Sequence, residues 1–137
     1  MHWSKFKYIE AILRDYPDYD KYIHDREQEL LYPVNMWEDE NIGGGRSGDI
    51  SNPTARKALT IAEDKRLCTL SKYKTAIQES LAESDDKTKE IIEQYYFARP
   101  QLKTWAGVAK GAYASERQCR RLRDAFFKLI DDKLGLP

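Results

Sequence analysis

The sequence contains few of the residues on which disulfide frameworks and zinc sites depend. It has two cysteines, Cys68 and Cys119, and two histidines, His2 and His24, with no Cys-x-x-Cys motif. A disulfide-rich secreted fold or a tetrahedral zinc site needs more of these side chains, at closer spacing. We therefore predict no metal and no cofactor, and we expect both cysteines to be buried as small apolar residues.

Long hydrophobic runs are also missing. No stretch of the 137 residues approaches the ~20 consecutive apolar residues that a membrane span requires. The first residues, MHWSKFKYIEAILRDY, carry charges among their apolar positions, which is not the pattern of a signal peptide. We predict a cytosolic protein with no membrane partner. Its length suits one domain, and a composition of 34% charged and 41% hydrophobic residues suits a helical protein with much exposed surface.

The chain has no net charge, but its charges are unevenly distributed. Residues 99–137 carry nine Lys and Arg against four Asp and Glu, a net charge of +5, and residues 1–98 carry the compensating −5. A basic C-terminal segment favours a polyanion as its partner, whereas the acidic N-terminal part would be repelled by the same ligand.

Apolar spacing predicts an all-α fold. Residues recurring every three or four positions indicate a pair of N-terminal helices, the first ended by Pro17 and the second running from about residue 18 to 31. A glycine-rich loop over 38–51 follows, and then a long helix over 53–82, with Asn52 as its cap. These elements make up a predicted N-terminal region, residues 1–83.

The glycine-rich loop literally matches a dinucleotide-binding motif. Its residues Gly43-Gly44-Gly45-Arg46-Ser47-Gly48 fit G-x-G-x-x-G. That motif binds nucleotides only between a buried strand and a helix, and no strand is predicted here. We interpret the loop as a connection between helical blocks, while its row of amides beside Arg46 leaves open a contact with phosphate or a partner protein.

The C-terminal region, residues 84–137, has the pattern of a helix-turn-helix. Ser84 begins one helix, Thr104 caps a short second helix from Trp105 to about Lys110, and a turn of four residues follows. Ser115 then caps a recognition helix over 116–130, and the helix from Ser84 supplies the third leg that buries the other two.

Four arginines fall within ten residues, ASERQCRRLR, at the start of this recognition helix. Arg117 and Arg121 lie opposite the apolar stripe that contains Cys119. Arginine offers a bidentate fork to guanine and Gln118 a similar pair to adenine, whereas Glu116 can accept from cytosine. Hydroxyl and basic side chains at helix starts suit phosphates. The predicted DNA-binding residues are Arg99, Lys103, Thr104, Ser115, Glu116, Arg117, Gln118, Arg120 and Arg121. The alternative is a solvated helix face whose arginine stems shield apolar surface.

Two resemblances agree with the helix-turn-helix. The segment SDDKTKEIIEQYYFARPQLKTWAGVAKGAYASERQCRRLRDAFFKLIDDKLG resembles region 4 of sigma factors. The segments ELLYP, DENIGGGRSGDISNPTARKA and YYFARPQLKTWAGVA together resemble the RinA family of phage transcriptional activators, across nearly the whole chain. That resemblance implies sequence-specific binding of promoter DNA in the cytoplasm of an infected or lysogenic bacterium, and activation of phage late or packaging genes.

The turn departs from the region 4 pattern. Such modules commonly carry glycine two places before the cap of the recognition helix, and here that place is Tyr113, with Gly111 two residues earlier. The sequence therefore allows a turn of different shape or one residue longer than usual.

Three other classes of function compete with an activator. An enzyme is not predicted, because the clustered acids Glu38-Asp39-Glu40 and Asp131-Asp132 have no imidazole beside them. A subunit like the phage terminase small subunit, which packages DNA, would also combine a helix-turn-helix with helical oligomerisation. A helical adaptor could bind RNA polymerase through the long helix and the loop at Trp37. The predicted partners are double-stranded DNA, RNA polymerase and a second copy of the chain as a homodimer.

Overall fold

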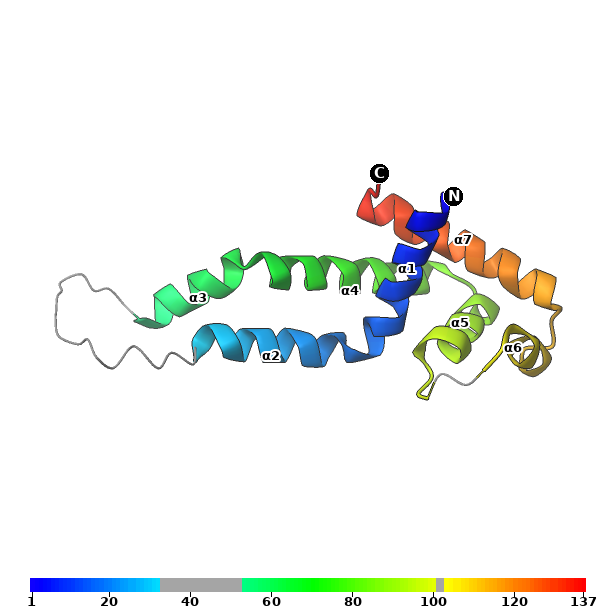
Figure 1. Cartoon of the computed structure of the whole chain (residues 1–137), viewed down its shortest axis with the longest axis horizontal. Coiled ribbons are helices and arrows are strands. Elements are labelled where there is room, and N and C mark those ends of the chain that lie inside the picture. The colour runs from blue at the N-terminus through cyan, green and yellow to red at the C-terminus, as the bar shows by residue number, and fades with distance from the viewer. Residues whose placement is uncertain (33–52, 101–102) are drawn as a thin grey trace. The chain divides into compact units, whose positions relative to one another are not determined.

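The computed structural model describes residues 1–32, 53–100 and 103–137 (Figure 1). Every regular element within these ranges is helical, which confirms the predicted all-α class. The predicted loop over 38–51, together with Trp37 and the cap Asn52, lies outside the described residues. None of the helices in the described ranges combines the length and apolar character that crossing a membrane requires.

The chain forms two compact units. The first, here called unit 1, comprises residues 1–19 and 72–137, and unit 2 comprises residues 20–71. The predicted boundary after residue 83 falls inside unit 1, in which the N-terminal helix joins the C-terminal ones. The division of the chain into regions 1–83 and 84–137 thus stays a prediction.

Unit 2 contains most of α2 (Tyr19–Leu31), α3 (Pro53–Glu63) and the beginning of α4 (Lys65–Glu83). The single helix predicted over 53–82 is interrupted at Asp64, which separates α3 from α4. The reason is a capping bond, because the Asp64 carboxylate accepts a hydrogen bond from the Leu67 amide at 2.9 Å. An aspartate that caps α4 in this way favours the end of α3 at the residue before it.

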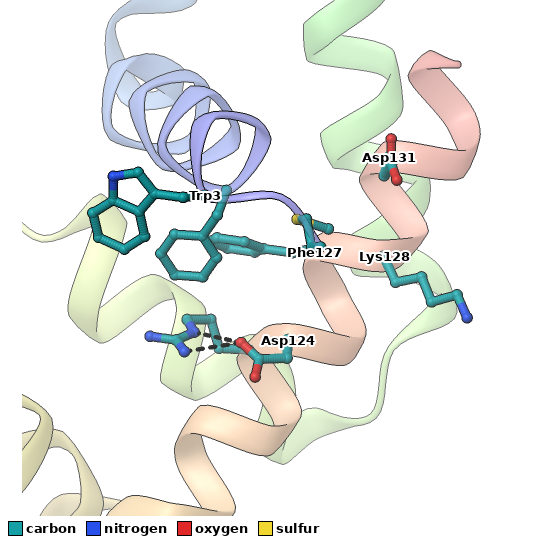
Figure 2. A pocket seen from close by; sticks show the side chains of 8 residues that line it. Trp3, Asp124, Phe127, Lys128 and Asp131 are labelled. Carbon is teal, nitrogen blue, oxygen red and sulfur yellow. Dashed lines mark hydrogen bonds and ion pairs between the residues drawn. The ribbon is translucent and has the colours of Figure 1, made fainter. Parts of the chain in front are cut away.

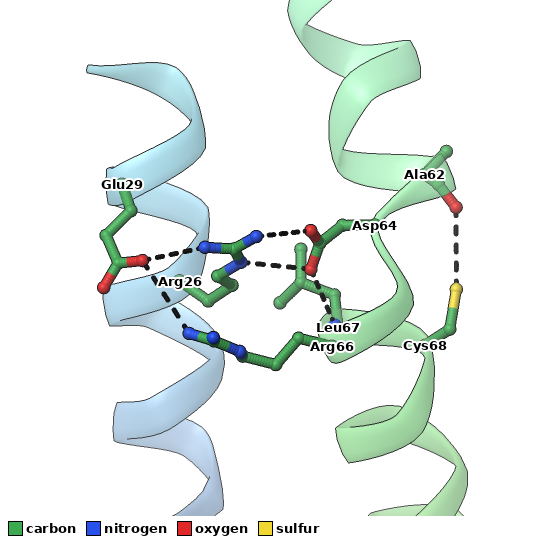
Figure 3. A network of polar contacts seen from close by, with 7 residues as sticks. All are labelled: Arg26, Glu29, Ala62, Asp64, Arg66, Leu67 and Cys68. Atoms are coloured by element: carbon green, nitrogen blue, oxygen red, sulfur yellow. Dashed lines mark hydrogen bonds and ion pairs between the residues drawn. The ribbon is translucent and has the colours of Figure 1, made fainter. Parts of the chain in front are cut away.

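A polar network holds the break to α2 (Figure 3). The Arg26 guanidinium donates to both carboxylate oxygens of Asp64, at 2.7 and 3.1 Å, and to Glu29 at 3.0 Å. Arg66 lies 3.9 Å from the same Glu29 carboxylate. The bond from Arg26, followed by that from the Leu67 amide, lowers the pKa of Asp64 to about 2.

This arrangement predicts how Asp64 titrates. Because its folded pKa lies below the usual 3.8, Asp64 stabilises unit 2 above that pH, and the contribution is lost as the pH falls towards 2. In the Arg26→Ala variant we expect the Asp64 pKa to rise towards 3.8, measured by carbon-13 NMR of the carboxyl group. Arg66→Ala is the control and should leave it near 2, because Arg66 is the weakest of the contributing groups. A wild-type value near 3.8 would contradict the network.

The two cysteines have different environments. Cys119 is 0% exposed, as predicted, but Cys68 is exposed, so that its predicted burial was wrong. Cys68 directly follows Leu67, the residue that α4 buries at this point, and one step of about 100° around a helix turns the next side chain towards solvent. The Cys68 thiol donates to the Ala62 carbonyl at 3.6 Å.

Unit 1 contains the elements of the predicted DNA-binding module. The elements of unit 1 are α1 (Trp3–Asp15), η1 (Tyr16–Asp18), the rest of α4, α5 (Asp86–Ile92), the π-helical η3 (Glu93–Phe97), α6 (Trp105–Gly111) and α7 (Glu116–Leu134), of which the last four fall within the predicted module. Asp85 rather than Ser84 caps α5, accepting from the Thr88 amide at 2.8 Å. The predicted recognition helix extends beyond residue 130 to Leu134, after which Gly135 takes a left-handed conformation with φ of 63°.

The core of unit 1 joins α1 to η3 and α7. Phe127 is fully buried, and its ring centroid lies 4.9 Å from that of Phe6 and 5.8 Å from that of Tyr96. The Tyr96 hydroxyl donates to the buried carboxylate of Glu10 at 2.8 Å. Burial, together with this bond, raises the pKa of Tyr96. The N-terminal helix is therefore part of the structure that supports α7.

Candidate nucleic-acid interface

Helices α5, α6 and α7 share one small core. It contains Ile91 of α5, Val108 and Ala109 of α6, Ala112 of the turn and Cys119 of α7, each at most 5% exposed. Partly buried side chains packed against this cluster are those of Tyr95, Trp105, Ala114 and Leu122. The small alanines and the cysteine let the helices approach closely, so that the start of α7 is held firmly against α6.

The turn between α6 and α7 is a Schellman motif. The Ala114 amide donates to the Ala109 carbonyl at 3.0 Å, and the Tyr113 amide donates to the Lys110 carbonyl at 3.4 Å. These are the two bonds that define the motif, and the residue at its left-handed position is Tyr113, with φ of 56°. The structure thus has a turn of the usual kind with tyrosine at the place where glycine is preferred.

Glycine at this position should stabilise the protein. A left-handed conformation costs an L-residue about 1–2 kcal/mol, and glycine avoids this cost. Part of the gain is offset, because glycine loses more conformational entropy on folding. The Tyr113 side chain is 92% exposed and contributes little packing. We expect Tyr113→Gly to raise the free energy of unfolding by roughly 0.5–1 kcal/mol in urea titrations. Tyr113→Ala serves as the control and should not gain as much, because alanine keeps the steric cost. A destabilised glycine variant would contradict the turn.

The two predicted caps of this region are confirmed. Thr104 accepts a hydrogen bond from the Gly107 amide at 3.1 Å at the start of α6, and Ser115 accepts one from the Gln118 amide at 3.0 Å at the start of α7. Each hydroxyl satisfies one of the free amides at its helix terminus.

The first turns of α7 present an exposed basic face. Arg117, Gln118 and Arg121 are exposed, and within the described residues their side chains have no hydrogen bond or ion pair. Arg120 lies 3.9 Å from the Glu116 carboxylate, a contact between neighbours on an exposed helix surface that contributes little to stability. Three polar side chains, two of them cationic, are therefore available to a ligand at this end of the helix.

The remaining predicted site residues precede α7 in sequence. Lys103 and Thr104 lie at the start of α6, where the Lys103 ammonium donates to the Gln94 side chain. Arg99 is held against the N-terminal segment, because its guanidinium donates to the Arg14 carbonyl at 2.6 Å and to the Asp18 carboxylate at 3.0 Å. The structure thus places six of the nine predicted residues on or beside the first turns of α7. Arg99, in contrast, is bonded to the N-terminal segment.

The fourth arginine of the cluster, Arg123, has a supporting position that the sequence pattern did not predict. Its guanidinium lies over the rings of Phe6 and Trp105, at 4.7 and 5.2 Å from their centroids. It also pairs with Asp124 at 2.9 Å, and its side chain is only 14% exposed. The one signal in the sequence was its place at the border of the apolar stripe. Arg123 connects α1 and α6 to α7 instead of joining the exposed face.

The fold and the exposed arginines define a class: a helical protein in which a short helix, a tight turn and a longer helix with a basic start pack on a third helix. Within the described residues no group of His, Cys, Asp and Glu side chains is placed to hold a metal ion. The chain belongs to the family described as "Protein of unknown function (DUF722)", whose model matches residues 5–132.

One curated relative is similar along almost its whole length. It is the "Transcriptional activator rinA" of Staphylococcus phage phi11, 27% identical over 134 residues that cover 96% of this chain and 91% of the relative. This similarity confirms the resemblance to RinA inferred from the sequence. No solved structure matches the chain.

Proposed function

We propose that this chain is a transcription activator that binds promoter DNA in a sequence-specific manner through the first turns of α7. The observation that carries the proposal is the similarity to a phage transcriptional activator over 96% of the chain. The exposed residues Arg117, Gln118 and Arg121 at the start of α7 support it, because this is the end of a recognition helix that reaches base edges in helix-turn-helix proteins.

The spacing of the two arginines fits the geometry of the major groove. Arg117 and Arg121 are separated by one helical turn, which is about 6 Å of rise along α7. Two successive base-pair steps of B-DNA cover about 7 Å, so that the two guanidinium groups can contact bases near one another in a single groove. Lys103, Arg120 and the capped helix starts at Thr104 and Ser115 then contact phosphates and set the orientation.

The finer targets are part of the same proposal. The resemblance to RinA favours phage late or packaging genes as targets, in the cytoplasm of the bacterial host, with RNA polymerase as the protein on which the activator acts. Because one recognition helix buries limited area on DNA, we propose that two copies bind together. The mass of the complex with and without DNA tests this homodimer.

Selection of bound duplexes from a random DNA library tests the function. Enrichment of one sequence motif by the wild-type chain would support a sequence-specific regulator and provide a site to search for in promoters. Binding without enrichment would mean that phosphate contacts dominate and would contradict sequence-specific recognition by α7. No binding at low salt would contradict DNA binding altogether.

A further inference from the structure

A pocket of about 600 Å³ lies between the start of α1 and the C-terminal half of α7, within unit 1 (Figure 2). The residues that line it are Met1, Trp3, Phe6, Arg123, Asp124, Phe127, Lys128 and Asp131. None of the predicted DNA-binding residues lines this pocket, and the six that lie on or beside α7 are at the other end of that helix. Its volume lies within the range of about 300–1,000 Å³ that is typical of ligand pockets.

One wall of the pocket is apolar and exposed. Trp3 is 68% exposed and Met1 59% exposed, although both are large hydrophobic residues. The Trp3 ring stacks on Phe6 with an interplanar angle of 10° and a centroid distance of 6.0 Å, and Phe6 in turn contacts the buried Phe127. A tryptophan held in place with most of its surface in water is the type of residue that becomes a binding hot spot when a partner covers it.

Among the described charged side chains of the rim, one cation has no partner. Arg123 pairs with Asp124 at 2.9 Å, and Asp131 pairs with Lys5 at 3.2 Å. Lys128 is exposed, has no hydrogen bond or ion pair within the described residues, and extends outward from α7 in Figure 2. The pocket therefore combines apolar surface with one uncompensated positive charge, and the complementary ligand carries an apolar side chain beside a carboxylate.

We propose that this pocket is the docking site for a segment of RNA polymerase in which an apolar side chain is followed or preceded by an acidic one. The proposal rests on the proposed function, because an activator bound at a promoter acts on the polymerase there. Lys128 follows Arg117 by eleven residues on the same continuous helix, which is about 16 Å of rise. One rigid element thus carries the DNA contact at its start and the protein contact in its second half.

The test separates activation from DNA binding. Trp3→Ala removes the exposed ring and Lys128→Glu reverses the free charge, and neither side chain contributes to the buried core. In transcription by purified bacterial RNA polymerase from a template with the selected duplex site, we expect each variant to reduce activation by about tenfold or more. Affinity for the duplex alone should stay within about twofold of the wild type.

Matched controls come from unit 2. Leu59→Ala shortens another exposed hydrophobic side chain, which is 57% exposed, and Lys65→Glu makes the same charge reversal at an exposed position of α4. Both controls should activate as the wild type does. Full activation by Trp3→Ala and Lys128→Glu would overturn the docking site.

Two further measurements identify the occupant of the pocket. If Trp3→Ala converts a wild-type dimer into a monomer, the occupant is a second copy of the chain, and the polymerase proposal is overturned. Anisotropy of the labelled full chain with purified polymerase, without DNA, tests the pocket directly. If the wild-type chain binds polymerase and Trp3→Ala weakens that binding, the docking site is supported even if the duplex selection fails. If the wild-type chain does not bind polymerase, the docking site is overturned even if the duplex selection succeeds.

Discussion

Replacing Arg117 and Arg121 together by alanine is expected to reduce affinity for the selected duplex by on the order of 30-fold or more at fixed salt. Each bidentate arginine contact with a base contributes about 1–3 kcal/mol of discrimination, so that two contribute about 2–6 kcal/mol. Both side chains are exposed and lack partners within the described residues, and the fold should therefore tolerate their truncation. Fluorescence anisotropy with the selected and a scrambled duplex measures the loss.

The control for this variant removes two positive charges from another helix. Arg56→Ala with Lys57→Ala changes exposed residues of α3, and its affinity for the duplex should remain close to that of the wild type. Equal loss in both double variants would mean that net charge, and not the face of α7, determines binding. Retained sequence preference in the Arg117 and Arg121 double variant would contradict base contacts by these residues.

A fragment of residues 84–137 is expected to lack a cooperative thermal unfolding transition, although it contains the whole predicted helix-turn-helix. In the full chain, α1 buries Ile9, Ile12 and Leu13, each at most 5% exposed. Burial of such side chains contributes about 1.5–3 kcal/mol each, or about 5–9 kcal/mol together. Because a domain is stable by only about 5–15 kcal/mol, losing this contribution unfolds the fragment or leaves it marginal.

Specific contacts of α1 add to this expectation. The fragment lacks Phe6, which covers Phe127, and Glu10, which accepts the hydrogen bond from the buried Tyr96 hydroxyl. Circular dichroism at 222 nm during heating, with the full chain melted under the same conditions, measures the difference. A sigmoidal melt of the fragment with the midpoint of the full chain would contradict the role of α1 and support residues 84–137 as an independent domain.

The predictions that were confirmed rest on interactions between near neighbours in the chain. Thr104 and Ser115 cap α6 and α7 through amides three residues ahead, and such bonds can be inferred from a short stretch of sequence. The burial of Cys119 and the exposure of Arg117 and Arg121 follow from helical periodicity alone. For the candidate site, local pattern was therefore sufficient to place the residues at the start of α7.

Apart from the exposed Cys68, the differences arose where distant segments meet. The break at Asp64 is tied to Arg26, which lies 38 positions away, and a pattern within 53–82 contains no sign of that partner. The Arg99 guanidinium bonds to the Arg14 carbonyl, 85 positions away, a contact that the local pattern does not indicate, and its contact with phosphate stays a prediction. Arg123 belongs to the same basic run as Arg117, yet the ring of Phe6 covers its guanidinium.

The sequence by itself determined that this protein is all-α and that its C-terminal residues form a short helix, a turn and a capped basic helix. Helix caps and amphipathic stripes depend on spacings of three and four residues, which one sequence displays directly. Only the tertiary structure decided which cations remain available to a ligand, because pairing and burial depend on segments far apart in the chain. It also decided that α1 supports α7 and that the two helices form the pocket beside Trp3, since contacts between α1 and α7 join opposite ends of the sequence.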